Sequence, residues 1–184
     1  GGEDITFDLS LIKKFGVRVN AFDPTPLAIE WVKSQASPAN FKLFEYGIAA
    51  YDGTALFSPP TNPNLDISHT MLREPGGREG QFEVPVKRLS TIMAELGHEK
   101  IDILKMDIEG AEFQVIEDIL KSNIQLDQLL VEFHHRSDYA SVGQLKVALA
   151  SLKAAGFEIV HISPLGEEYS FVHRKPLATG LSRP

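Results

Sequence analysis

Apolar positions along the 184-residue chain switch repeatedly between helical and extended spacing. Between residues 5 and 15 they recur every three to four residues, as on one face of a helix, whereas 101–106 is a short and mostly apolar run typical of a buried strand. The same patterns predict helices over 5–15, 26–35, 89–96, 111–120 and 142–155, and strands over 17–22, 41–46, 54–58, 82–86, 101–106, 126–133, 157–162 and 168–173. Strands that alternate with helices favour a mostly parallel sheet with helices on both faces.

The last two predicted strands, 157–162 and 168–173, are separated only by a short turn. Parallel strands need a long crossover, so this pair should be antiparallel. We therefore expect a Rossmann-like α/β fold, a single domain over 1–184 with a mostly parallel seven-stranded sheet and one antiparallel strand near the C-terminus. In such a sheet a glycine-rich loop follows the first strand, so the first strand is expected to precede Gly1.

Composition narrows the possible functions. A net charge of -7 and a pI of about 5.4 repel phosphate backbones, which argues against nucleic acid as a partner. The chain has no cysteine, which excludes disulfides and thiolate metal sites and suits a cytoplasmic location. No apolar run approaches the ~20 residues of a membrane span. Residues 58–80 are rich in Pro, Gly and Asn and are expected to form an insertion or lid within the domain.

Ionisable side chains follow two neighbouring predicted strands. Asp107 and Glu109 come after 101–106, and Glu132 and His134 end 126–133. Parallel strands present their carboxyl ends at one edge of a sheet, and alternation puts Glu132 and His134 on the same face. Such a group could supply a general base, or Asp107, Glu132 and His134 could hold a divalent cation such as Mg²⁺. The plainer interpretation is a surface loop and an acidic helix start.

Two further positions fit the recognition of a nucleotide-like cofactor. Asp23 ends the strand 17–22, roughly twenty residues after Gly1 and Gly2, where Rossmann-like domains place an acid on ribose hydroxyls. The alternative is a turn, because Asp-Pro is a frequent turn starter. Two glycines before a helix allow a ligand close to the backbone, although a cloning remnant would have the same sequence.

Four segments carry a resemblance to a known family: FDPTP at 22–26, VKRLSTI at 86–92, DILKMDIEGAE at 102–112 and VEFHH at 131–135. Together they resemble the FkbM-type methyltransferases, which use S-adenosylmethionine. The resemblance implies a class I methyltransferase fold and methyl transfer, generally to oxygen, with a sugar, glycan or small natural product as acceptor. It implies cofactor contacts at Gly1, Gly2, Glu3, Asp23, Pro24, Ile48, Ala49 and Asp107, and catalytic roles among Asp107, Glu109, Glu132 and His134.

Two other functions stay open at this point. A nicotinamide-dependent enzyme could use a similar sheet, but the chain shows no full GxGxxG motif. A non-catalytic binding module could have kept the fold, although a scaffold has no need for charged groups at two strand ends. The acceptor, the need for a metal and a possible homo-oligomer are not decided by the sequence.

Overall fold

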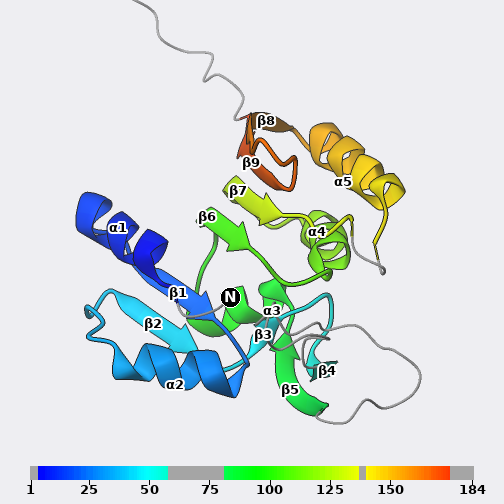
Figure 1. The fold of residues 1–184 in the computed structure, drawn as a ribbon. Coiled ribbons are helices and arrows are strands. Elements are labelled where there is room, and N and C mark those ends of the chain that lie inside the picture. The colour runs from blue at the N-terminus through cyan, green and yellow to red at the C-terminus, as the bar shows by residue number, and fades with distance from the viewer. Residues whose placement is uncertain (1–3, 58–80, 137–139, 175–184) are drawn as a thin grey trace, which may run out of the picture.

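The computed structural model describes residues 4–57, 81–136 and 140–174 (Figure 1). The elements are α1 (Thr6–Phe15), β1 (Val19–Phe22), α2 (Pro26–Ser34), β2 (Phe41–Phe44), β3 (Gly47–Ile48), β4 (Gly53–Phe57), β5 (Phe82–Lys87), α3 (Leu89–Leu96), β6 (Ile101–Met106), α4 (Glu112–Lys121), β7 (Leu126–Glu132), α5 (Val142–Ala154), β8 (Phe157–Ile162) and β9 (Glu168–His173). The predicted α/β alternation is confirmed. The expected insertion at 58–80 and Gly1, Gly2 and Glu3 lie outside the described residues.

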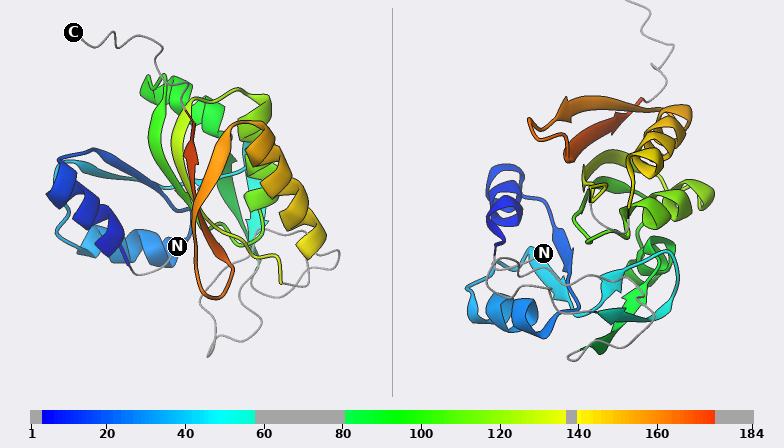
Figure 2. Two further views of the ribbon diagram at one scale, coloured as in Figure 1. Left: turned by 90° about the horizontal axis from the view of Figure 1, so that it is seen from above. Right: turned by 45° about the vertical axis from the view of Figure 1, so that its right-hand side comes forward.

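The strands form three sheets, in the orders β1-β2, β3-β5-β4 and β6-β7-β9-β8 (Figures 1 and 2). Strands β1 and β2 are parallel, as are β6 and β7. Strand β9 runs antiparallel to both β7 and β8, so the predicted antiparallel closing pair is confirmed. The parallel β6–β7 pairing brings the carboxyl ends of these two strands to the same edge.

The expectation of one seven-stranded sheet is wrong for the described residues, whose sheets contain two, three and four strands. Within this part of the chain, β1 pairs only with β2, and β6 only with β7. The other edges of β1 and β6 line one cavity of about 750 Å³ instead of bonding to each other. The two pairs of strands are therefore too far apart to share backbone hydrogen bonds.

The largest hydrophobic core lies on the four-stranded sheet. It joins β6, β7 and β9 to α3, α4 and α5, and its fully buried side chains include Ile116, Leu129, Leu152 and Phe171. Along β7, Leu126, Leu129 and Val131 are buried, and the intervening side chains are more exposed. Burial of this apolar surface anchors β6 and β7, and thereby fixes the edge at which their ionisable side chains stand.

A separate core joins β1 and β2 to α1 and α2, which lie on the same side of the strands (Figure 2, left). The strand residues of this core occupy alternate, paired positions and therefore share one face: Val19, Ala21, Phe41 and Leu43. Ile5 of the α1 entry, Val32 of α2 and Phe41 of β2 are its buried members. Helix α1 ends at Gly16, which has the left-handed φ of 65° that glycine adopts most readily. This small unit positions Asp23, the residue after β1.

Candidate functional site

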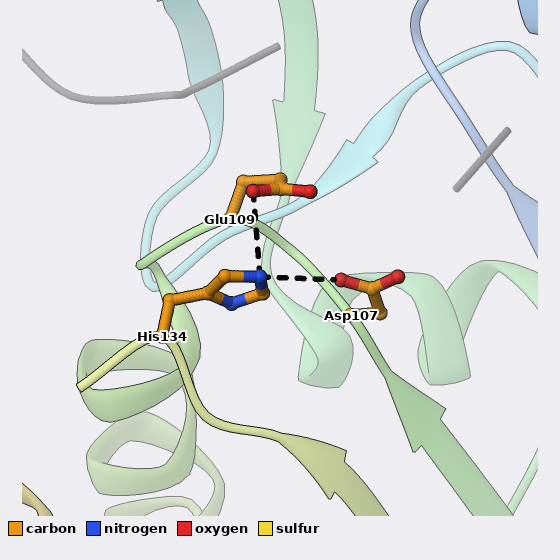
Figure 3. Close-up of side chains that lie close together, drawn as sticks. All are labelled: Asp107, Glu109 and His134. Atoms are coloured by element: carbon orange, nitrogen blue, oxygen red, sulfur yellow. Dashed lines mark ion pairs between the residues drawn. The ribbon is translucent and has the colours of Figure 1, made fainter. Parts of the chain in front are cut away.

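Asp107, Glu109 and His134 converge at the carboxyl ends of β6 and β7 (Figure 3). His134 Nε2 lies 3.4 Å from Glu109 Oε2 and 3.7 Å from Asp107 Oδ1. All three side chains are partly buried, with 19–24% of each exposed. Of the four ionisable side chains expected to meet at this edge, these three lie together, because β6 and β7 are adjacent and parallel.

The turn between β6 and α4 has unusual backbone geometry. Glu109 has a φ of 53° and Gly110 a φ of 100°. Glycine tolerates such values, but a residue with a side chain seldom adopts them, and those that do gather at functional sites. The left-handed turn directs the Glu109 carboxylate back towards His134 (Figure 3).

Glu112, the first residue of α4, is completely buried beneath this turn. Its carboxylate accepts hydrogen bonds from the backbone N–H of Gly110, at 3.0 and 3.1 Å, and of Ile108, at 3.3 Å. It also lies 2.9 Å from His134 Nδ1. Glu112 is not among the predicted site residues, because an acid at a helix start is explained well enough by the positive end of the helix dipole.

The surroundings of His134 alter its proton affinity. Burial by itself would lower the pKa of His134, but the hydrogen bond and charge of Glu112, with the charges of Glu109 and Asp107, raise it to about 9. At neutral pH the ring is therefore an imidazolium among three carboxylates. The pKa of Glu132 is raised as well, first by burial and then by the charge of Asp107.

The free energy of unfolding should therefore fall with rising pH. The folded-state pKa of His134 is about 9, above the unfolded value of about 6.5, so its contribution is complete below pH ~6.5 and is lost as pH rises through about 9. We expect a loss of about 3 kcal/mol across this window. Urea unfolding in EDTA, followed at several pH values, measures it. His134→Gln should flatten the dependence, and equal pH slopes in both proteins would contradict the assignment.

Most of the predicted cofactor residues that the structure describes line one cavity. Asp23, Pro24, Ile48 and Asp107 all contribute to its wall, together with Glu109. Ala49 does not: it is 2% exposed and packs in the core of the three-stranded sheet. The two sides of the cavity are thus built by the ends of β1 and β6, far apart in the sequence.

Asp23 is held rigidly at the cavity wall. Its Oδ1 accepts hydrogen bonds from the Thr25 backbone N–H at 2.9 Å and from Thr25 Oγ1 at 2.6 Å. Asp23 therefore does stabilise a turn, which was the alternative considered for it. A carboxylate has two oxygens and several acceptor positions, so a turn contact through Oδ1 is compatible with ligand binding as well.

Donor atoms suited to a metal ion are present at the same edge. One ligand atom each from Asp107, Glu109 and His134 lie within 4.8 Å of one another. The predicted set had Glu132 in place of Glu109. Glu132 instead lines a neighbouring hollow of about 240 Å³ with Phe133, His134, Arg136 and Glu167. His134 thus stands between this hollow and the acids of the larger cavity.

Comparison with known proteins finds several partial matches. The chain is 27% identical over 161 residues to the 2-O-methyltransferase NoeI of Sinorhizobium fredii, a match that covers 80% of this chain and 65% of NoeI. It is 42% identical over 50 residues to the human probable methyltransferase-like protein 24, covering 26% of this chain and 14% of that protein. The AMB antimetabolite synthetase AmbE of Pseudomonas aeruginosa is 32% identical over 77 residues, or 40% of this chain and 4% of AmbE.

The chain spans less than two thirds of the length of these curated relatives. No solved structure matches it. Among the helices that the structure describes, none has the length and apolarity needed to cross a membrane. Residues 10–159 match the family described as Methyltransferase FkbM domain, and the chain belongs to this methyltransferase family.

Proposed function

We propose that this chain binds S-adenosylmethionine in the cavity between β1 and β6 and transfers its methyl group to an oxygen of a hydroxyl-bearing acceptor, a sugar or small natural product. The observation that carries the proposal is the convergence of Asp23 and Asp107 on one cavity, with His134 directly behind Asp107. The name of NoeI, a 2-O-methyltransferase, supports oxygen as the methyl acceptor.

In this proposal each cavity residue has a distinct task. Asp23 accepts hydrogen bonds from the ribose hydroxyls, while Pro24 and Ile48 give an apolar wall for the adenosine. Asp107 and Glu109 also line this cavity, and their carboxylates would favour the positive sulfonium. The hollow that Glu132 and His134 line would admit the acceptor.

Methyl transfer is then an in-line displacement. The acceptor oxygen forms a bond to the methyl carbon, and the electron pair of the broken carbon–sulfur bond stays on sulfur, leaving neutral S-adenosylhomocysteine. A neutral alcohol is a poor nucleophile, so a base must take its proton. His134 Nε2 is the proposed base. Its proton must leave first, and a sulfonium bound nearby assists this, because two positive charges repel.

A divalent cation is the alternative means of activating the hydroxyl. Asp107, Glu109 and His134 would hold it, and a bound cation would acidify the hydroxyl. An imidazole ligand suits Mn²⁺ or Zn²⁺ better than Mg²⁺, which prefers oxygen. Methyl transfer that persists in EDTA supports the general base, whereas activity that is lost in EDTA and restored by Mn²⁺ supports the cation.

Calorimetric titration with S-adenosylhomocysteine tests cofactor binding. Asp23→Asn preserves an oxygen for the Thr25 contacts but removes the charge, and we expect it to weaken binding about 10- to 100-fold, the equivalent of charged hydrogen bonds worth about 1.5–3 kcal/mol. Glu45→Gln is the matched control, because this exposed acid pairs with Lys33 on the surface and should leave the affinity unchanged. Absence of binding to the folded protein, or equal affinities in the two variants, would refute the proposal.

A further inference from the structure

The fully buried carboxylate of Glu112 connects two parts of the site that are distant in sequence. It accepts from backbone N–H groups of the β6–α4 turn, and it contacts the ring of His134, which follows β7. Burying a charge is costly unless hydrogen bonds compensate for it. Here the Gly110 and Ile108 N–H groups, the imidazole and the N-terminus of α4 together provide that compensation.

In the neutral ring, the contact with Glu112 favours the proton on one nitrogen of His134 over the other. A carboxylate can only accept, so Nδ1, 2.9 Å from Glu112 Oε1, must be the protonated donor. In the neutral ring the other nitrogen, Nε2, is then the unprotonated one. This nitrogen faces Glu109 and Asp107, whose carboxylates line the larger cavity.

We infer that Glu112 is a positioning residue, which fixes the Nδ1–H tautomer and the ring orientation of His134 and ties both to the turn that carries Asp107 and Glu109. The inference rests on the proposed function for its purpose, because a base at Nε2 matters only if a proton is to be taken there. Its structural content is independent of the acceptor and of methyl transfer. Glu112 itself is not among the described residues that line the cavity.

Nitrogen NMR of the ring tests the inference directly. Long-range ¹H–¹⁵N spectra detect both ring nitrogens through non-exchanging protons, and His134→Gln assigns the signals. Spectra recorded above the pKa of about 9 report the neutral ring. We expect a protonated Nδ1 and an unprotonated Nε2 in the unmodified protein. The opposite tautomer there would overturn the inference, whether or not any variant folds.

Glu112→Met supplies the second measurement, because methionine has a similar length but cannot accept the Nδ1 proton. We expect His134 to change to the Nε2–H tautomer, with Nε2 donating to Glu109 or Asp107. Glu117→Met, at an exposed position of the same helix, should keep the original tautomer. A folded Glu112→Met that keeps the original tautomer would overturn the inference.

The two hypotheses fail in different ways. If the unmodified protein binds no S-adenosylhomocysteine but His134 is protonated at Nδ1, the proposed function fails and the positioning of His134 by Glu112 is supported. If the protein binds S-adenosylhomocysteine but the neutral ring of His134 is protonated at Nε2, cofactor binding is supported and the role of Glu112 is overturned.

Discussion

Replacing His134 with glutamine should slow methyl transfer by about 10²- to 10⁴-fold, the usual contribution of a general base. Glutamine keeps a polar side chain among the acids but cannot take a proton. Because the pKa of His134 is raised to about 9, the rate of the unmodified protein should also increase with pH up to that region, and His134→Gln should lose this dependence. The affinity for S-adenosylhomocysteine should be unchanged, because His134 is not one of the described residues that line the larger cavity.

The experiment follows labelled methyl from S-adenosylmethionine into a panel of sugars and hydroxylated natural products, over a range of pH. His161→Gln is the matched control, since this histidine is exposed on β8, away from the site. Its rate should equal that of the unmodified protein. If the His134→Gln rate is within about threefold of the original, the loss is much smaller than removal of a general base causes. Another group would then activate the hydroxyl.

Phe133→Ala should lower the free energy of unfolding by about 3–5 kcal/mol, the cost of removing a large aromatic ring from a closed core. Phe133 is 1% exposed and packs between Phe113, with ring centroids 5.5 Å apart, and Tyr169, at 5.4 Å. These partners come from α4 and β9. The ring therefore packs the end of β7 against α4 and β9, and Phe133 directly precedes His134 in the sequence.

Urea unfolding of the two proteins measures this loss. Phe15→Ala makes the same chemical change at a ring that is 62% exposed, and it should alter stability by no more than about 0.5 kcal/mol. Similar losses in the two variants would show that Phe133 is not held in a closed core. Since Phe133 adjoins His134, a destabilised Phe133→Ala protein should also lose rate at temperatures where it remains folded.

Local patterns were enough to predict much of this fold. The apolar run 101–106 coincides with β6, and the short turn before β9 correctly indicated an antiparallel pair. Sheet continuity was not predictable, because it depends on which edges meet in space. The edges of β1 and β6 face a shared cavity, and nothing within either strand reports this.

For the candidate site as well, local patterns predicted part of the arrangement, and contacts between distant residues were not predictable. The meeting of Asp107, Glu109 and His134 followed from two parallel strand ends, although their chemical roles remain predictions. Alternation along β7 suggested Glu132 as a ligand, whereas the left-handed turn at Glu109 brings that acid to His134 instead. Glu112 was missed because its importance arises from an imidazole 22 positions further along the chain.

The open edges of β1 and β6 bear on how the protein behaves in a concentrated solution. Apolar side chains that border the cavity, Phe7, Val17 and Ile103, are 36–40% exposed. Among the described residues, β1 pairs only with β2, and β6 only with β7. An exposed edge of this kind is a template for a foreign strand. The protein is thus expected to associate as its concentration rises, and an occupant of the cavity would keep it soluble as well as act as a ligand.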